Sequence, residues 1–132
     1  MIVETSALIA IVREEPEENA FIHALEAADV RRMSAANYLE AAIVIDGTRS
    51  PIATRGFDDF ITRANITIEP VTAEQAVIAR AAYRDFGKGS GNPAKLNFGD
   101  CFAYALAKAS DEPLLFKGDE FSYTDVKPAL GR

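Results

Sequence analysis

The amino-acid sequence predicts an α/β domain of three layers, in which helices cover both faces of a central parallel sheet. Short apolar runs that suit buried strands, such as residues 1–3 and 113–116, alternate along the chain with amphipathic helical segments. Signals for the start of a helix follow these runs closely, as is typical of strand–helix–strand units. A chain of 132 residues has the usual size of one domain, so we expect residues 1–132 to form a single domain.

Helix and strand signals alternate in the first half of the chain. Thr5 or Ser6 can cap the first helix, and Ser34 can cap the third. Ser50 followed by Pro51 marks a further helix start, because proline fits the first helical turn. The elements expected here are a strand at 1–3, a helix at 7–12, a helix with an apolar stripe at 21–28, a strand at 30–33, a helix from Ser34 to about residue 46 and a helix beginning at 51.

The second half continues the alternation. Thr72 and Gln75 form a capping box, and Asn97 can cap the last helix. A stretch rich in Gly, Ser, Asn and Pro predicts a loop between these two helices. The elements expected here are a strand at 67–71, a helix at 73–86, a loop at 87–93, a helix at 98–109 and a strand at 113–116, whereas residues from 125 onward carry no clear signal.

Composition narrows the chemistry and the setting. One cysteine cannot form an internal disulfide and suits a reducing compartment, while one histidine, His23, excludes His-rich metal sites and is expected on the surface. A net charge of −6 disfavours non-specific binding of nucleic acid unless cations or basic patches offset it. The longest apolar runs, 7–12 and 41–45, are far shorter than the ~20 residues that span a bilayer. We expect a cytoplasmic protein with no membrane contact.

Four carboxylates lie at strand ends or in apolar helices of the predicted fold, where an acid can have a function. Glu4 follows the first strand, Glu40 lies in an apolar helix expected to be buried, Asp100 opens another apolar helix, and Asp119 follows the last strand. Ligand sites of parallel sheets lie beyond the carboxyl ends of the strands, where most of these acids fall. Each acid also has a structural explanation: helix-dipole stabilisation for Glu4 and Asp100, an arginine partner for Glu40, and a turn for Asp119.

Convergence of these acids would require a counter-charge. Two unit charges 4 Å apart cost about 4 kcal/mol at an effective dielectric of ~20, so cations or protonation would have to offset the repulsion. Mg²⁺ or Mn²⁺ held by carboxylates activates water and stabilises charge on a phosphate, which favours phosphodiester cleavage. A nucleophilic Cys101 is disfavoured, because a cysteine in an apolar helix is usually a core residue.

Four segments of the chain resemble the PIN-domain ribonucleases, and within them the VapC toxins of bacterial toxin–antitoxin pairs. The segments are residues 1–8 (MIVETSAL), 34–40 (SAANYLE), 96–108 (LNFGDCFAYALAK) and 114–121 (LLFKGDEF). The resemblance implies a three-layer PIN-like domain and an endoribonuclease that uses Mg²⁺ or Mn²⁺. It also implies a homodimer and a small VapB-type antitoxin that blocks the site.

By the same resemblance, the catalytic and metal-binding residues would be Glu4, Glu40, Asp100 and Asp119, with Glu120 and Asp125 as alternatives for the last. The family normally has aspartate where this chain has Glu4. The extra methylene moves the carboxylate by over ~1 Å, and a misplacement of that size can lower a rate ~10²-fold. We therefore expect metal binding to survive and turnover to be attenuated.

RNA would reach an acidic protein through local basic segments. Lys88 and Lys95, like Arg49 and Arg55, lie in stretches without acids, and we expect them to contact phosphates; ordinary solvated charges are the alternative. Two other functions stay open: a catalytically weakened PIN domain that acts as a binding partner, and a receiver-like signalling module in which Lys117 follows the last strand. The first strand ends in a single acid rather than an acidic pair, which weakens the receiver-like alternative.

Overall fold

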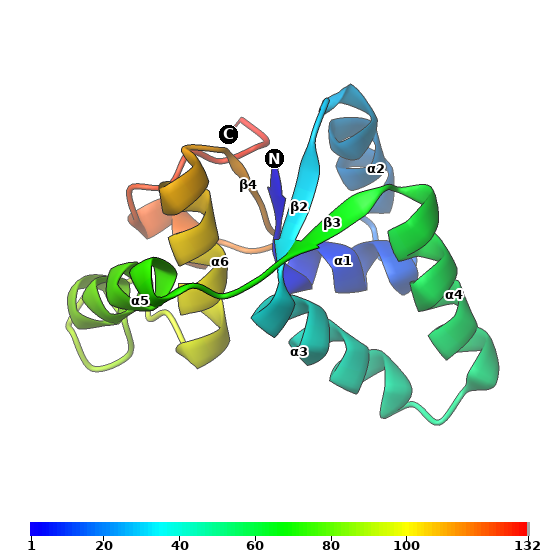
Figure 1. Ribbon diagram of the computed structural model, residues 1–132, viewed down its shortest axis with the longest axis horizontal. Coiled ribbons are helices and arrows are strands. Elements are labelled where there is room, and N and C mark those ends of the chain that lie inside the picture. Colours follow the sequence, from blue (N-terminus) through cyan, green and yellow to red (C-terminus); the bar gives the residue numbers. More distant parts are fainter. Residues whose placement is uncertain (132) are drawn as a thin grey trace.

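Within residues 1–131, the part of the chain that the structure describes, four parallel strands form the central sheet. The computed structural model orders them β3-β2-β1-β4 (Figure 1). The strand bounds are Ile2–Val3 for β1, Arg31–Ser34 for β2, Ile66–Glu69 for β3 and Leu114–Leu115 for β4. The predicted parallel sheet is therefore confirmed, and β1 and β4 are shorter than the apolar runs 1–3 and 113–116 that predict them.

The helices begin where the sequence predicts caps. Side chains of Ser34, Ser50, Thr72 and Asn97 each accept a hydrogen bond from the first turn of the helix that follows. None of the helices within residues 1–131 is long and apolar enough to cross a membrane. The helix bounds are Thr5–Val12 for α1, Glu18–Ala27 for α2, Ala35–Asp46 for α3, Pro51–Arg63 for α4, Ala73–Phe86 for α5, Phe98–Ser110 for α6 and Glu120–Tyr123 for a short 3-10 helix.

The first helix begins two residues earlier than expected. Its N-cap is Glu4 rather than Thr5 or Ser6, and the Glu4 side chain accepts a hydrogen bond from the backbone N–H of Ser6. The reason is that β1 ends at Val3, so the chain turns straight from strand into helix and the carboxylate reaches an amide that lacks a helical partner. The hydroxyls of Thr5 and Ser6 are thereby available to other acceptors.

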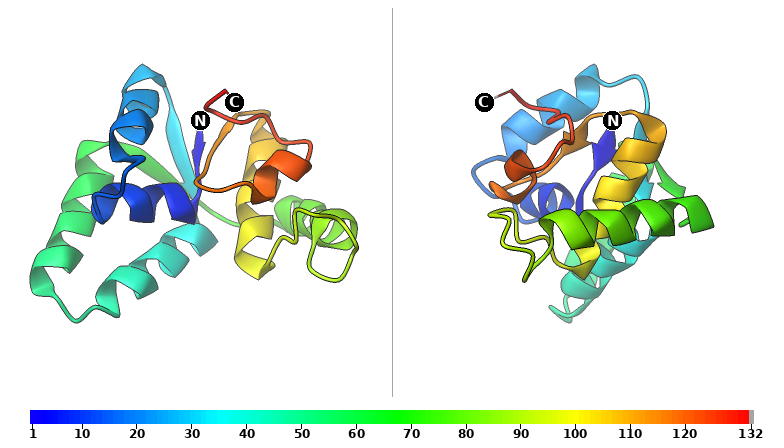
Figure 2. Two further views of the ribbon diagram at one scale, coloured as in Figure 1. Left: turned by 180° about the vertical axis from the view of Figure 1, so that it is seen from behind. Right: turned by 90° about the vertical axis from the view of Figure 1, so that its left-hand side faces the viewer.

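Two separate cores lie on the two faces of the sheet. Helices α1 to α4 cover one face over a core that includes Leu8, Met33 and Phe57, and α5 and α6 cover the other over Leu96 and Leu114 (Figures 1 and 2). The left-hand view of Figure 2 shows the sheet between the two groups of helices. The predicted three-layer α/β/α architecture is confirmed.

Three helices begin at one edge of this sandwich. Strands β1 and β2 run toward the edge at which α1 and α3 start, and α6 starts at the same edge and runs back along the sheet (Figure 1). A hydrogen bond from Asn37 in the first turns of α3 to the carbonyl of Gly99 in α6 joins the two layers there. Ligand sites of parallel sheets lie beyond the carboxyl ends of the strands. The fold therefore predicts a site near the starts of α1, α3 and α6.

Helix α3 is less buried than its sequence predicts. The apolar composition of this helix predicts burial on nearly every face, yet Leu39, Ile43 and Val44 are 58%, 62% and 38% exposed. The opposite side, with Ala41 and Ile45, packs into the core. The expectation is wrong because only one side of α3 faces the sheet and its neighbouring helices, which leaves an apolar stripe uncovered.

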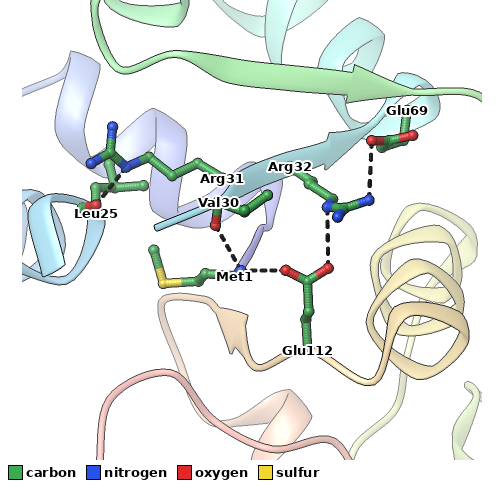
Figure 3. A network of polar contacts seen from close by, with 7 residues as sticks. All are labelled: Met1, Leu25, Val30, Arg31, Arg32, Glu69 and Glu112. Atoms are coloured by element: carbon green, nitrogen blue, oxygen red, sulfur yellow. Dashed lines mark hydrogen bonds and ion pairs between the residues drawn. The ribbon is translucent and has the colours of Figure 1, made fainter. Parts of the chain in front are cut away.

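A network of ion pairs ties three elements of the sheet together away from these helix starts. The guanidinium of Arg32 in β2 lies 3.2 Å from Glu112 and 3.5 Å from Glu69 at the end of β3 (Figure 3). Glu112 also lies 2.7 Å from the amino group of Met1, which donates a second hydrogen bond to the carbonyl of Val30 (Figure 3). The network holds β1, β2 and β3 in register and uses none of the four predicted site acids.

Candidate active site

Glu4 is an acid held almost out of contact with water. Its side chain is 4% exposed, and its carboxylate accepts hydrogen bonds from both the backbone N–H (2.8 Å) and the hydroxyl of Ser6. Burial raises the pKa of Glu4 from 4.5 to about 7; the bonds from Ser6 oppose this rise, and the charges of Asp100 and Glu40 add to it. Near neutral pH this group therefore divides between its protonated and charged forms.

Glu40 is held by donors from its own helix and from α1. The hydroxyl of Thr5 lies 2.5 Å from Oε1 of Glu40, and the amide of Asn37 lies 3.3 Å from the same oxygen. Asn37 stands three residues before Glu40 and so shares its face of the helix. The partners of Glu40 are thus a hydroxyl and an amide, in place of the arginine that a structural role would require.

Asp100 sits in the first turn of α6. Its carboxylate accepts a hydrogen bond from the backbone N–H of Asn97 at 2.9 Å, while Asn97 accepts one from the N–H of Asp100, which completes a capping box. Burial raises the pKa of Asp100 despite the bond from Asn97; the charges of Glu120 and Glu40 raise it further, and Lys88 lowers it. The structural explanation of Asp100 is therefore correct, and the residue also faces other acids.

Two neighbouring acids, Asp119 and Glu120, follow β4 in the chain. The charge of Glu120 acts on the pKa of Asp100, and its carboxylate lies against Gly118, where a Cβ would come within 2.6 Å of Oε2. Asp119 directly precedes the 3-10 helix, and both Asp119 and Glu120 are exposed. Asp125 is turned along α6, where it accepts hydrogen bonds from Tyr104 at 2.6 Å and Lys108 at 3.1 Å.

Glu4 caps α1, Glu40 lies near the middle of α3 and Asp100 lies in the first turn of α6, and the charges of these acids influence one another. Asp100 and Glu40 both raise the pKa of Glu4, and Glu40 raises that of Asp100. Gly99 permits this approach, because a Cβ at that position would overlap the carboxylate of Glu40. Even so, no three Asp, Glu, His or Cys side chains among residues 1–131 are placed together as ligands of one metal ion. Local hydrogen bonds hold Oε2 of Glu4, Oε1 of Glu40 and Oδ2 of Asp100.

The cysteine and the histidine take the roles expected of them. Cys101 is buried within the core of α5 and α6, and burial raises the pKa of its thiol to about 11, so it is not a thiolate at neutral pH. His23 is exposed on α2. Neither residue therefore acts as a nucleophile or a base in the candidate site.

The predicted basic residues separate into two groups. Lys88 and Lys95 line a groove of about 720 Å³ in the glycine-rich loop before α6, and Lys88 acts on the pKa of Asp100. Arg49 follows the far end of α3, and Arg55 lies on α4, which packs on the opposite side of the molecule from α6 (Figure 1). Among these four residues, Lys88 is the one whose charge acts on Asp100, and Lys95 lines the same groove as Lys88.

Three residues of the site have no place in the sequence-based prediction. Thr5 and Ser6 stand out there only as possible caps, although they bind Glu40 and Glu4, respectively. Asn37 is fully buried, and its one signal in the sequence is a polar side chain one turn before the acid in an apolar helix. Side chains that act through an acid are hard to recognise before the fold shows which groups touch it.

Comparison with known sequences places the chain in a family. The model of the PIN domain matches residues 1–127. Ribonuclease VapC28 of Mycobacterium tuberculosis is 57% identical over 132 residues, which cover 100% of this chain and 99% of that protein. Ribonuclease VapC42 of the same organism is 46% identical over 129 residues, which cover 98% of each chain.

Comparison with solved structures supports the same fold. VapC20 of Mycobacterium tuberculosis, a toxin that cleaves the sarcin-ricin loop, superposes with a TM-score of 0.70 at 15% identity over 96% of this chain and 98% of that one. A toxin–antitoxin complex from Klebsiella pneumoniae gives a TM-score of 0.67 at 18% identity, over 92% of this chain and 89% of that one. The family match also decides against a receiver-like module. The chain therefore belongs to the PIN-domain family and, within it, to the VapC ribonucleases.

Proposed function

We propose that this VapC ribonuclease is a metal-dependent endoribonuclease and the toxin of a toxin–antitoxin pair acting on RNA in the cytoplasm. The observation that supports it most is the mutual electrostatic influence of Glu4, Glu40 and Asp100. Glu4, Glu40 and Asp100 belong to three different helices, and the repulsion between their charges disfavours bringing them near one another. A divalent cation would turn this repulsion into a binding site.

The donor set suits a hard cation such as Mg²⁺ or Mn²⁺. Glu4, Glu40 and Asp100 offer only oxygen atoms, and Glu120 is the fourth acid that we assign to the site in place of Asp119. Each of the three inner carboxylates has one oxygen in a local hydrogen bond, so the bonds steady the group and spare its other oxygen. When bound, such an ion lowers the pKa of water and stabilises charge on the attacked phosphate.

The residues of the chain itself position these carboxylates. Thr5 and Asn37 fix Oε1 of Glu40, and the capping box fixes Asp100 at the start of α6. The charge of Lys88 near Asp100 offers a contact for a phosphate of the RNA backbone. Together these groups would hold an RNA phosphate beside the acids in a fixed orientation.

Cleavage of RNA by the purified chain tests the proposal. We expect Mn²⁺-dependent cleavage that EDTA abolishes and that falls at least ~10²-fold in Glu40→Gln and in Asp100→Asn, because each change removes one charge from the cation site. Asp58→Asn on α4, an exposed acid far from the site, is the matched control and should leave the rate unchanged. Cleavage that survives in both site variants would mean a contaminating nuclease. Mn²⁺ binding without cleavage by the wild type would instead support the weakened PIN domain.

The two basic pairs provide a test of how RNA approaches. We propose that Lys88 and Lys95 contact phosphates, since the charge of Lys88 acts on Asp100 and Lys95 lines the same groove, and that Arg49 and Arg55 do not. Replacing both lysines by alanine should reduce the slope of log K against log salt by up to about 1.4, which corresponds to two single-strand phosphate contacts. The double Arg49→Ala, Arg55→Ala variant removes the same charge and should leave the slope unchanged; equal effects of both pairs would contradict this path.

We propose that a second copy of the chain covers an apolar face beside the acids. Phe98 is 78% exposed and packs edge-on against Phe102 between two grooves of about 420 and 240 Å³. One groove is lined by α3 and α6 and the other by α5 and α6. Exposed apolar patches of this kind mark interaction surfaces. We call this surface the apolar face; its residues are Leu39, Ile43, Val44, Tyr83, Phe98 and Phe102.

The inhibitor in this proposal is a small VapB-type antitoxin that binds over the acids. Support comes from the VapC relatives and from a chain of the same fold that was solved in a toxin–antitoxin complex. We expect a small protein encoded beside this gene to copurify with the chain and to suppress its cleavage of RNA at a stoichiometric ratio. A copurifying protein that leaves cleavage intact would contradict the inhibitory role.

A further inference from the structure

We propose that Asn37 is a positioning residue for Glu40: its amide joins α3 to the start of α6 and holds the Glu40 carboxylate beside Asp100. This inference rests on the proposed nuclease function, since it assigns a role within the same site. Asn37 does not reach the space of the substrate, because its side chain is fully buried. It would act through Glu40 and through the backbone of Gly99.

The contacts of the Asn37 side chain run in two directions. Its Nδ2 donates to the carbonyl of Gly99 at 2.9 Å and lies 3.3 Å from Oε1 of Glu40. Its Oδ1 is buried and has no hydrogen-bond partner among residues 1–131. An unpaired buried acceptor disfavours the folded state, so this position carries an amide at a cost in stability. The same amide supplies the two hydrogen bonds from Nδ2 to Glu40 and to Gly99.

Helices α3 and α6 belong to different layers, and this explains why such a tie is needed. The buried residues of α3 belong to the core on one face of the sheet and those of α6 to the core on the other, so the two helices share no buried core. Glu40 must cross this boundary to face Asp100, and the missing side chain at Gly99 gives it the space. The hydrogen bond from Asn37 to the carbonyl of Gly99 joins α3 to α6. The hydrogen bond from Thr5 holds the Glu40 carboxylate from the side of α1.

Three variants separate the positioning role of Asn37 from its effect on stability. Asn37→Leu keeps the volume of the side chain and removes its hydrogen-bond donors. Asn37→Ala is the second variant, to be used if leucine does not fit. Ile45→Val is the control, because it lowers the stability of the same helix away from Glu40. Ile45 is 1% exposed, and its change to valine typically costs ~0.5–1.5 kcal/mol. The measurements are the kcat of RNA cleavage, the dissociation constant for Mn²⁺ by calorimetry, RNA affinity in EDTA, and thermal unfolding.

We expect both Asn37 variants to lower kcat and to raise the Mn²⁺ dissociation constant by about 10–100-fold, as is typical when a group that orients a metal ligand is lost. RNA affinity in EDTA should stay close to that of the wild type, and Ile45→Val should keep kcat and Mn²⁺ affinity while its unfolding temperature falls. Wild-type kcat and Mn²⁺ affinity in Asn37→Leu would overturn the inference, as would an equal loss in Ile45→Val. A wild type that neither binds Mn²⁺ nor cleaves RNA would overturn the proposed function itself.

Discussion

At the scale of single residues, Glu4 carries a carboxyl group into a place that disfavours its charge. The group is buried between β1 and α1, faces Asp100 and Glu40, and has Ser6 as its donor. A carboxyl in that environment is stabilised by a proton or by a cation. We therefore expect the free energy of unfolding to depend on pH and on divalent cations through Glu4.

The pH dependence of stability tests this link. Because the folded pKa of Glu4, about 7, exceeds the value of 4.5 expected when unfolded, the folded state binds the proton more tightly. Its contribution to stability is complete below pH 4.5 and is lost as the pH rises to about 7; the full shift corresponds to roughly 3 kcal/mol. In urea unfolding with EDTA present, Glu4→Gln should thus gain stability relative to the wild type between these pH values. A difference that is independent of pH would contradict the assignment.

A second prediction concerns the length of the same side chain. Glu4→Asp shortens the carboxylate by one methylene, and the family normally has aspartate at this position. We expect RNA cleavage at saturating Mg²⁺ to rise, by up to ~10²-fold if the extra methylene now displaces the ligand by over ~1 Å. Initial rates of the two proteins at equal concentration measure the effect, and a rate that is equal or higher with Glu4 would reject it.

At the scale of elements, helix starts are what the sequence predicts best. Caps at Ser34, Ser50, Thr72 and Asn97 depend on contacts within one turn, so local sequence is sufficient to place them. Partners of the acids depend on contacts between elements, and sequence alone does not supply these.

The acids at the end of β4 show this limit most clearly. Asp119 and Glu120 are neighbours in the chain, and either fits a site that follows a strand. Glu120 lies against the turn at Gly118 and its charge raises the pKa of Asp100, which is the observation behind our assignment of Glu120. The spacing in the sequence predicts that an acid follows β4. It does not predict which of Asp119 and Glu120 belongs to the site, because that depends on the geometry of one turn.

Gly99 offers a test at the level of one helix. Alanine stabilises a helix interior by ~0.5–1 kcal/mol over glycine, so Gly99→Ala should not weaken α6 through propensity. Its Cβ would overlap the carboxylate of Glu40, however, and we expect cleavage to fall by about 10²-fold as that group is displaced. Gly56→Ala in α4 is the control, because nothing lies within 4 Å of the added Cβ. It should keep full activity, and equal activity of both variants would contradict a close approach of Glu40.

At the scale of the whole molecule, the apolar face is the feature that a single chain does not explain. Apolar residues on α3 predict burial, and the burial they predict is absent within residues 1–131 on the side that carries Leu39 and Ile43. Sequence patterns report how much apolar surface a helix has, and not whether the same chain or another one covers it. The second copy that we propose would resolve the disagreement, since a dimer would complete the expected burial.

Ile43 and Ile52 form a matched pair for testing this explanation. Both are exposed isoleucines, at 62% and 83%, but Ile43 lies on the apolar face and Ile52 lies on α4, away from it. Lysine at position 43 would place a charge in the interface twice, once for each copy. Because burying an isoleucine is worth about 1.5–3 kcal/mol, the dimer dissociation constant should rise at least ~10-fold. Sedimentation should show a dimer for the wild type and for Ile52→Lys, and a shift toward monomer for Ile43→Lys. A monomeric wild type, or equal dissociation in both variants, would mean that another partner covers this face.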